Sequence, residues 1–454
     1  MPLVQKALAL FKNVHFQSLL GNGVMAGLGM VTIGMLYRAL SINDIGVYVF
    51  FMTINNLIDT LKSGFLTMPF VKFYAGTNEE RQNEVAGSTW TLAILVTAVL
   101  LLLNIPTFFI ARHVDDAAIE LLLKCFSLVF LSTLPSFMAN VVVQAESRFD
   151  RLLWLRLINQ LLFIATIVVL MVLHRATVSS AIIAFIATNA LTSVIIMLTG
   201  WTKAYSIKYT TKKTIAEIFH FGKYSMGTSL SSNLFGVTDT IFIKIFLGAP
   251  ALAIYNLGGR LNQIVEIPML SFAASGMPAL SAYYNQNQKD NLMYTMKKLI
   301  GMLSIAIFAI AIVAIIFADP IILLLGGHKY IGSQAPNIFR LFISIAILYP
   351  SDRFFALTLD VIHKPKINFY KILVMLAVNL IADYIAISIC KSTYSIIMAN
   401  IFPVLAAIII AYIPLNKYSK FNFWSIYSVG YKEIVIFIKQ TYGTFVTKKA
   451  AAKG

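Results

Sequence analysis

Residues 237–284 read VTDTIFIKIFLGAPALAIYNLGGRLNQIVEIPMLSFAASGMPALSAYY, and this stretch decides the fold class. It contains two long apolar runs joined by the short turn FLGAP, with only four charged side chains in 48 positions. A helix rises 1.5 Å per residue, so about 20 apolar residues cross a hydrocarbon layer of roughly 30 Å. The stretch therefore predicts two consecutive membrane-spanning helices.

Similar runs recur along nearly the whole chain of 454 residues, of which 59% are hydrophobic and 12% charged. About twelve runs of about 18 to 25 residues can be delimited, each long enough to span a bilayer. They are continuous rather than alternating, which favours helices over the strands of an outer-membrane barrel. The prediction is an all-α polytopic membrane protein with about twelve transmembrane helices.

An internal repeat divides these helices into two sets of six. The pattern Y-x6-N-[NQ]-x2-[DE] occurs at 48–59 and again at 255–266, and M-P-x4-Y follows at 68–74 and 277–283. A duplicated unit of six spans keeps its orientation in the membrane because six is even. The repeat predicts two six-helix bundles related by a pseudo-two-fold axis along the membrane normal, an arrangement typical of transporters.

The expected domains follow from this division. They are an N-terminal bundle at 1–200, a basic cytoplasmic linker at 201–217, a C-terminal bundle at 218–416 and a tail at 417–454. Aromatic and aliphatic residues in the tail recur near helical spacing among lysines, which predicts an amphipathic helix on the cytoplasmic leaflet. A thirteenth span is the alternative.

The net charge of +17 is distributed unevenly over the connections between the runs. Most lysines and arginines, with Arg148, Arg151 and Arg156 among them, are assigned to alternate connections on one side. Under the positive-inside rule, that side is cytoplasmic. We expect a bacterial inner-membrane protein with both termini in the cytoplasm, and no nucleic-acid partner.

Polar side chains lie inside several of the apolar runs, where a charge costs about 2.5 to 3.5 kcal/mol on insertion scales. Asn55, Asp59 and Lys62 are spaced i, i+4 and i+7 and share a helix face, with Asn56 beside them. The corresponding set in the second half is Arg260, Asn262, Gln263 and Glu266. Further polar positions are Asp239, Lys244, Asn140, Gln144, Asp352 and Arg353.

These polar faces predict a water-filled cationic cavity between the two halves. The alternative is a set of structural ion pairs, such as Asp59 with Lys62, and Arg353 with Asp352 or Glu266. Buried ion pairs are seldom a net source of stability, so a bundle that needed only stability would replace most of them with apolar side chains. Their number therefore favours a functional role.

Motifs of soluble enzymes are absent from the sequence: it has no G-x4-G-K-[ST], H-E-x2-H or G-x-S-x-G pattern. The two cysteines, Cys125 and Cys390, form no metal-binding motif. We expect a transporter rather than an enzyme, without catalytic residues or a metal site.

Three stretches resemble the multidrug/oligosaccharidyl-lipid/polysaccharide (MOP) exporter superfamily, and within it the Wzx-type polysaccharide-repeat or O-antigen flippases. They are 237–284, LSINDIGVYVFFMTINNL at 40–57 and QAESRFDRLLWLRLI at 144–158. The resemblance implies a MATE-like fold and a flippase that moves an undecaprenyl-diphosphate-linked oligosaccharide from the inner to the outer leaflet by alternating access. It implies no cofactor, leaves coupling to a proton or sodium open, and suggests a polysaccharide polymerase and glycosyltransferases as partners.

The resemblance also suggests roles for the polar residues. Lys62, Lys244, Arg260 and Arg353 would attract the diphosphate, whereas Asn55, Asn56, Asn262 and Gln263 would bind sugar hydroxyls. Asp59, Asp239 or Glu266 would bind a coupling ion.

The sequence differs from two other branches of the superfamily. The first run, Phe16 to Leu36, has no carboxylate, unlike typical drug exporters, and the two extra C-terminal helices of lipid II flippases are not evident. The alternatives left open are a cation-coupled multidrug or metabolite exporter, a membrane polysaccharide polymerase or glycosyltransferase, and a structural scaffold.

Overall fold

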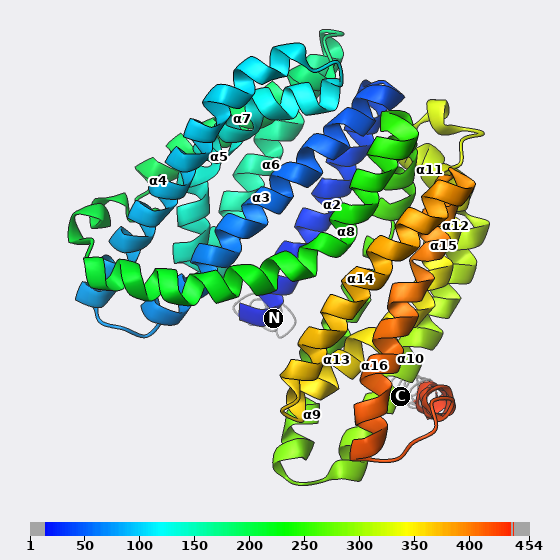
Figure 1. Ribbon diagram of the computed structural model, residues 1–454. Coiled ribbons are helices and arrows are strands. Elements are labelled where there is room, and N and C mark those ends of the chain that lie inside the picture. The colour runs from blue at the N-terminus through cyan, green and yellow to red at the C-terminus, as the bar shows by residue number, and fades with distance from the viewer. Residues whose placement is uncertain (1–13, 437–438, 440–454) are drawn as a thin grey trace, which may run out of the picture. The chain divides into compact units, whose positions relative to one another are not determined.

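A computed structural model describes residues 14–436 and 439, and its regular structure in these residues is helical throughout (Figure 1). The chain forms two compact units: the first runs to Ala253 and includes Leu324–Lys329, and the second contains the remaining residues. Residues 1–13 of the predicted N-terminal bundle, and 437–438 and 440–454 of the predicted tail, lie outside the described residues.

The helices of the first unit are α2 (Val14–Ala39), α3 (Ile42–Tyr74), α4 (Glu79–Ile110), η1 (Ala111–His113), α5 (Ala117–Ala145), α6 (Phe149–Val172), α7 (Val178–Leu198), η2 (Ala204–Tyr209) and most of α8 (Lys212–Arg260). Those that follow are α9 (Gln263–Asn285), α10 (Lys289–Ile316), α11 (Ala318–Gly326), η3 (His328–Tyr330), α12 (Ala335–Ile345), η4 (Ala346–Leu348), α13 (Tyr349–Val361), α14 (Pro365–Cys390), α15 (Thr393–Ala399) and α16 (Ile401–Tyr418). A last described helix covers residues 425–436.

Within the described residues, nine helices are long and apolar enough to cross a membrane. Three further helices, α2, α3 and α9, occupy the other positions at which spans are predicted. α3 contains Asp44, Asp59, Lys62 and Lys72, which lower its mean hydropathy. The prediction of an all-α polytopic membrane protein is confirmed.

Polar side chains cap the N-termini of several helices in the first unit. Each accepts a hydrogen bond from backbone N–H groups of the first turn, which have no partner within the helix. Ser41 accepts from the N–H of Asp44 at the start of α3, and Asn78 accepts from Arg81 at the start of α4. Asp116 accepts from the N–H groups of Ala118 and Ile119 at the start of α5. These residues set where one span ends and the next begins.

The long helix α8 packs mostly with the first unit, and the compact units divide after Ala253. The predicted domain bounds, with their linker at 201–217, stay a prediction. Its aromatic residues contact α3: Phe219 meets Phe65 edge to face at 5.6 Å, and Phe221 meets Phe73 at 6.0 Å. Gly248, with φ of 85°, interrupts the helical backbone of α8 in a conformation that glycine adopts without strain. Phe219 and Phe221 therefore pack the N-terminal part of α8 against α3.

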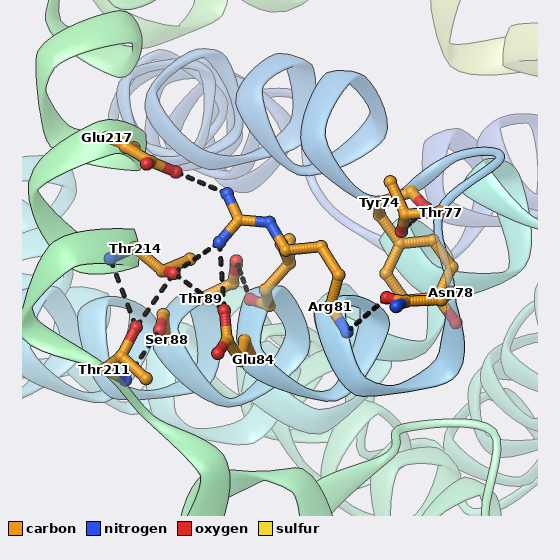
Figure 2. Close-up of polar contacts among 11 residues, drawn as sticks. Tyr74, Thr77, Asn78, Arg81, Glu84, Ser88, Thr89, Thr211, Thr214 and Glu217 are labelled. Atoms are coloured by element: carbon orange, nitrogen blue, oxygen red, sulfur yellow. Dashed lines mark hydrogen bonds and ion pairs between the residues drawn. The ribbon is translucent and has the colours of Figure 1, made fainter.

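A polar network joins the start of α4 to the start of α8 (Figure 2). Arg81 of α4 donates to Glu84, to the hydroxyl of Thr214 and to Glu217, and Thr211 caps α8 at Thr214. Arg81 and Glu217 are each about one-third exposed, so water screens the pair and its main effect is on geometry. The network fixes the connecting segment against the first bundle.

In the second unit, an aromatic cluster closes the end of α16. Phe355 of α13 lies 6.4 Å from Tyr412 and 6.2 Å from Phe421, and Tyr412 donates its hydroxyl to the carbonyl of Phe421. This cluster fixes the turn after α16 and the position of the following helix.

Candidate functional site

A cavity of about 300 Å³ lies inside the first unit, among α2, α3, α5, α6 and α7. Its wall combines apolar and aromatic side chains with an unusual number of amides. The polar residues that line it are Asn55, Asn56, Asp59, Lys62, Thr133, Ser136, Asn140, Arg156, Asn159, Gln160, Asn189 and Thr192. Two of these side chains are cationic and one is anionic, which leaves a net charge of +1 on the lining.

Lys62 is the most deeply buried charge of this cavity. Its Nζ lies 2.9 Å from Oδ1 of Asp59, outside hydrogen-bonding geometry, and its side chain is 1% exposed against 48% for Asp59. The ammonium also lies 4.5 Å from the ring centre of Phe137 and 5.1 Å from that of Phe130. Cation–π contact and the carboxylate together hold a charge that burial alone would disfavour.

Asn55 presents a hydrogen-bonding atom to the same cavity. Its Nδ2 donates to the carbonyl of Phe51 at 2.9 Å, which fixes the amide plane against α3. Its Oδ1 is buried and has no hydrogen-bond partner among the described residues. Buried acceptors are usually satisfied, so this oxygen is suited to accept a bond from water or from a ligand.

Further amides come from α6 and α7. Asn159 donates to Oδ1 of Asn189 at 3.0 Å and to the hydroxyl of Thr192 at 3.3 Å, and Asn189 donates to the carbonyl of Phe185. Gln160 of α6 donates to the hydroxyl of Thr32 on α2. The bonds order the amides in advance, so a polar ligand would meet fixed donors and acceptors.

The structure places the predicted residues in different surroundings. It brings Lys62, Asp59, Asn55 and Asn56 together on the cavity of the first unit. The predicted residues of the second unit are Arg260, Asn262, Gln263, Glu266 and Arg353, and among them Arg260, Glu266 and Arg353 are exposed. Arg260 donates to Oδ1 of Asn256 on its own helix.

Two predicted residues lie on the part of α8 that belongs to the first unit. Lys244 is engaged by Asp116, with 2.5 Å between Nζ and Oδ2, and its side chain is 10% exposed. Asp239 is buried. Neither lines the 300 Å³ cavity.

Arg156 was counted from the sequence among the basic residues of one side of the membrane, and the structure places it in the cavity wall. It lies two turns inside α6 and lines the cavity. Asn159 and Gln160 follow it at i+3 and i+4, a spacing that places all three on one helix face. That spacing in the segment WLRLINQL was the available signal.

The second unit contains three buried polar residues, Asn379, Asp383 and Lys371, for which the sequence predicted no role in a site. On α14, Asn379 donates to Oδ2 of Asp383 at 2.7 Å, and both side chains are fully buried. Lys371 of the same helix is 4% exposed and lies 2.6 Å from Oδ1 of Asp352 on α13. The N-x3-D spacing on an apolar helix was the signal for the first pair.

Among the described residues, no three His, Cys, Asp or Glu side chains are grouped as they would be around a metal ion. The chemistry that the cavity offers is hydrogen bonding and charge attraction.

Residues 35–335 match a family model described as "Polysaccharide biosynthesis protein". No curated protein matches the chain. Among solved structures, the chain is similar to an inward-facing multidrug resistance MATE family transporter of the MOP superfamily, with a TM-score of 0.70, 15% identity and coverage of 89% of this chain and 95% of that one.

The lipid II flippase MurJ in an inward closed conformation gives a TM-score of 0.71 at 15% identity, covering 92% of this chain and 91% of its own. A MOP superfamily transporter from Pyrococcus furiosus, whose binding pocket is described as having reverse polarity, gives 0.58 at 14% identity, covering 91% and 98%. These similarities show a MATE-like fold, as predicted.

Proposed function

Since the chain belongs to the polysaccharide biosynthesis protein family, we propose that it is a flippase that carries a lipid-linked oligosaccharide from the inner to the outer leaflet. The observation that carries the proposal is the polar cavity of the first unit, in which Lys62 and Arg156 stand among six amide side chains. Arginine and lysine attract phosphate and carboxylate groups, and amides bind hydroxyls through both donor and acceptor atoms. A glycan joined to a diphosphate offers both kinds of partner.

The cavity volume limits what can enter. About 300 Å³ lies at the lower end of the range of small-molecule pockets, which is roughly 300 to 1,000 Å³. The cavity therefore holds a small part of an oligosaccharide, with the rest outside it. The polyisoprenoid chain stays among the lipid tails, because an apolar chain gains nothing from a polar cavity.

Residue roles follow from these surroundings. Lys62 and Arg156 attract the anionic part of the headgroup, and Asn55, Asn159 and Asn189 bind sugar hydroxyls. Arg260 and Arg353 remain the proposed cations of the second unit, with Asn262 and Gln263 as its proposed sugar ligands. Lys244 is not among the cations that we propose to bind the headgroup, because Asp116 already forms an ion pair with it.

Asp59 is the coupling-ion candidate that lines the cavity, where a proton or a sodium ion would compete with Lys62 for its carboxylate. Asp239 and Glu266 remain candidates on α8 and α9. We propose the bacterial inner membrane as the location, with both termini on the cytoplasmic side, because the basic connections favour that side.

Reconstitution tests the proposal. Purified protein in proteoliposomes with a fluorescent undecaprenyl-diphosphate-linked oligosaccharide should move the label between leaflets, as measured by its loss of access to an external quencher. An imposed proton or sodium gradient should accelerate the movement if coupling exists. No movement with or without a gradient would contradict the proposal.

Two further measurements separate the alternative functions. Efflux of cationic dyes from cells that overproduce the protein, without glycan movement, would favour a multidrug exporter. A change in the length of the recovered oligosaccharide would favour a polymerase or glycosyltransferase.

A further inference from the structure

The helix at 425–436, drawn in red near the C-terminus in Figure 1, is docked on α10 through two glycines. A Cβ atom built on Gly430 would lie 2.3 Å from the carbonyl carbon of Gly301, so the two backbones touch. Ile426, one turn before Gly430, is fully buried. Only glycine permits this approach, and the docked face therefore has a single register on α10.

Polar contacts fix the same register. Tyr294 of α10 donates its hydroxyl to Oε1 of Glu433 at 2.5 Å, and Lys298 forms an ion pair with Glu433. Hydrogen bonds from Lys298 and Tyr294 lower the pKa of Glu433. Ile426, Gly430 and Glu433 are spaced i, i+4 and i+7, which makes them one face of the helix.

The depth of this helix is set by its neighbours. In α10 the charged residues Lys289, Asp290, Lys297 and Lys298 precede an uncharged, mostly apolar run that begins at Leu299. Glu433 contacts the last of these lysines, and Gly430 contacts the first turn of the apolar run. The 26-residue apolar span 393–418 ends only six residues before the helix starts. The helix therefore lies beside the charged end of the α10 span and just after the end of another span, which is where a helix at the boundary between hydrocarbon and headgroups would lie.

The opposite face of the helix is exposed. Trp424, which directly precedes the helix, is 73% exposed, Tyr431 65% and Ile436 46%, and Ser428 is exposed between Trp424 and Tyr431. Tryptophan and tyrosine are enriched where a membrane meets water, because their rings are apolar and their N–H and O–H groups are polar. This face has the composition of a helix that lies in the plane of a bilayer surface.

The charged residues of this segment indicate which class of lipid it binds. Lys417, Lys420, Lys432 and Lys439 are exposed. Glu433 is the one carboxylate in 417–439, and its ion pair with Lys298 directs it to the docked face. Exposed lysines therefore precede the helix (Lys417 and Lys420), lie on it (Lys432) and follow it (Lys439), with no exposed carboxylate in the described part of this segment. Each lysine near a membrane surface adds to the attraction for anionic lipids.

We propose that residues 417–439 bind anionic phospholipid headgroups through these four lysines, with Trp424 and Tyr431 inserted at the interface. The glycine contact with α10 and the ion pair of Glu433 hold the helix so that this face lies parallel to the bilayer surface. The C-terminal segment is then a lipid-binding element fixed to a membrane span, not a freely moving tether. The inference does not depend on which substrate the protein moves.

The test uses the full chain with Cys125 and Cys390 replaced by serine and a new cysteine at Ser428→Cys, labelled with an environment-sensitive fluorophore. Vesicles are made of phosphatidylcholine alone or with added phosphatidylglycerol. We expect the emission to shift to the blue and its intensity at least to double with phosphatidylglycerol, and brominated lipid to quench it. Because Ser428 is exposed, the substitution leaves the docked face intact.

A variant with all four lysines changed to glutamine should lose the response to phosphatidylglycerol, and high salt should weaken it in the parent. A label at Gln286→Cys, in the exposed connection between α9 and α10, is the control and should change little. An unchanged label at Ser428 in both vesicle types would overturn the proposal. A blue shift that depends on protein concentration in detergent would overturn it as well, because it would indicate a second copy of the chain on this face.

Discussion

Nζ of Lys244 lies 2.5 Å from Oδ2 of Asp116, and the same carboxylate accepts the N–H bonds that begin α5. One side chain therefore acts both as the N-cap of α5 and as the anchor of α8. Removing it should release two helices at once.

We predict that Asp116→Ala destabilises the protein more than Asp116→Asn does. Asparagine caps helices as well as aspartate, whereas alanine loses about 1 kcal/mol of capping. Both variants lose the charge opposite Lys244. Thermal unfolding in detergent measures the difference, and equal melting temperatures would show that the cap contributes nothing.

The pH dependence of stability gives a separate test at the same residue. Burial would raise the pKa of Asp116, but the hydrogen bonds from Lys244 and from the amides of Ile119 and Ala118 lower it overall. A carboxyl with a lowered folded-state pKa stabilises the protein above its unfolded pKa of about 3.9, and this contribution is lost as pH falls through the folded value. Unfolding between pH 6 and pH 3 should therefore depend less on pH in Asp116→Asn than in the parent.

Substitution of Asp59 should lower the stability of the protein more than substitution of its partner Lys62. Asp59→Ala leaves a buried ammonium without its carboxylate, and we expect a loss of about 1 to 3 kcal/mol, reduced from the ~3 to 5 of a fully buried pair because Asp59 is half-exposed. Lys62→Met keeps the shape of the stem and leaves a carboxylate that water can reach, so stability should change less. Lys62→Met should nevertheless slow glycan movement. Melting temperatures and flipping rates of both variants check this, and normal flipping by Lys62→Met would remove this residue from the site.

We expect substitution of Arg156 to slow transport directly, and not only through a loss of stability. We predict that Arg156→Gln lowers the flipping rate by about 10- to 100-fold, the equivalent of one charged hydrogen bond of about 1.5 to 3 kcal/mol. Arg156→Lys should retain part of the rate. The matched control is Arg148→Gln at the start of the same helix, since Arg148 is exposed and paired with Asp150. A similar loss in both variants would point to a general effect of charge.

The fold could be predicted from the sequence because each apolar run is long enough to span a bilayer by itself. Periodicity also placed Asn55, Asp59 and Lys62 on one face of α3, and they share a cavity in the structure. The partner of Lys244 could not be predicted, because Asp116 lies 128 residues away along the chain. Such a contact depends on how α5 and α8 pack, which no local pattern encodes.

Arg156 illustrates a different limit. A cation near the end of a predicted span fits the positive-inside rule equally well whether it faces water or a cavity. The predicted span 152–173 already contained Arg156, but only the packing of α6 in the structure shows that its side chain lines the cavity. The start of α8 was also not predicted. This helix begins at Lys212, inside the predicted linker 201–217, and continues into the segment assigned to the second bundle.

Photo-crosslinking shows whether the glycan enters the cavity of the first unit. A photoreactive amino acid replaces Asn189, inside the cavity, or Ile183, which lies on the same helix and is 61% exposed. The proposed cavity site predicts a crosslink from position 189, and not from position 183, to the sugar part of an undecaprenyl-diphosphate-linked oligosaccharide, with loss of the crosslink when unlabelled substrate competes. Unimpaired flipping without any crosslink from position 189 would contradict it.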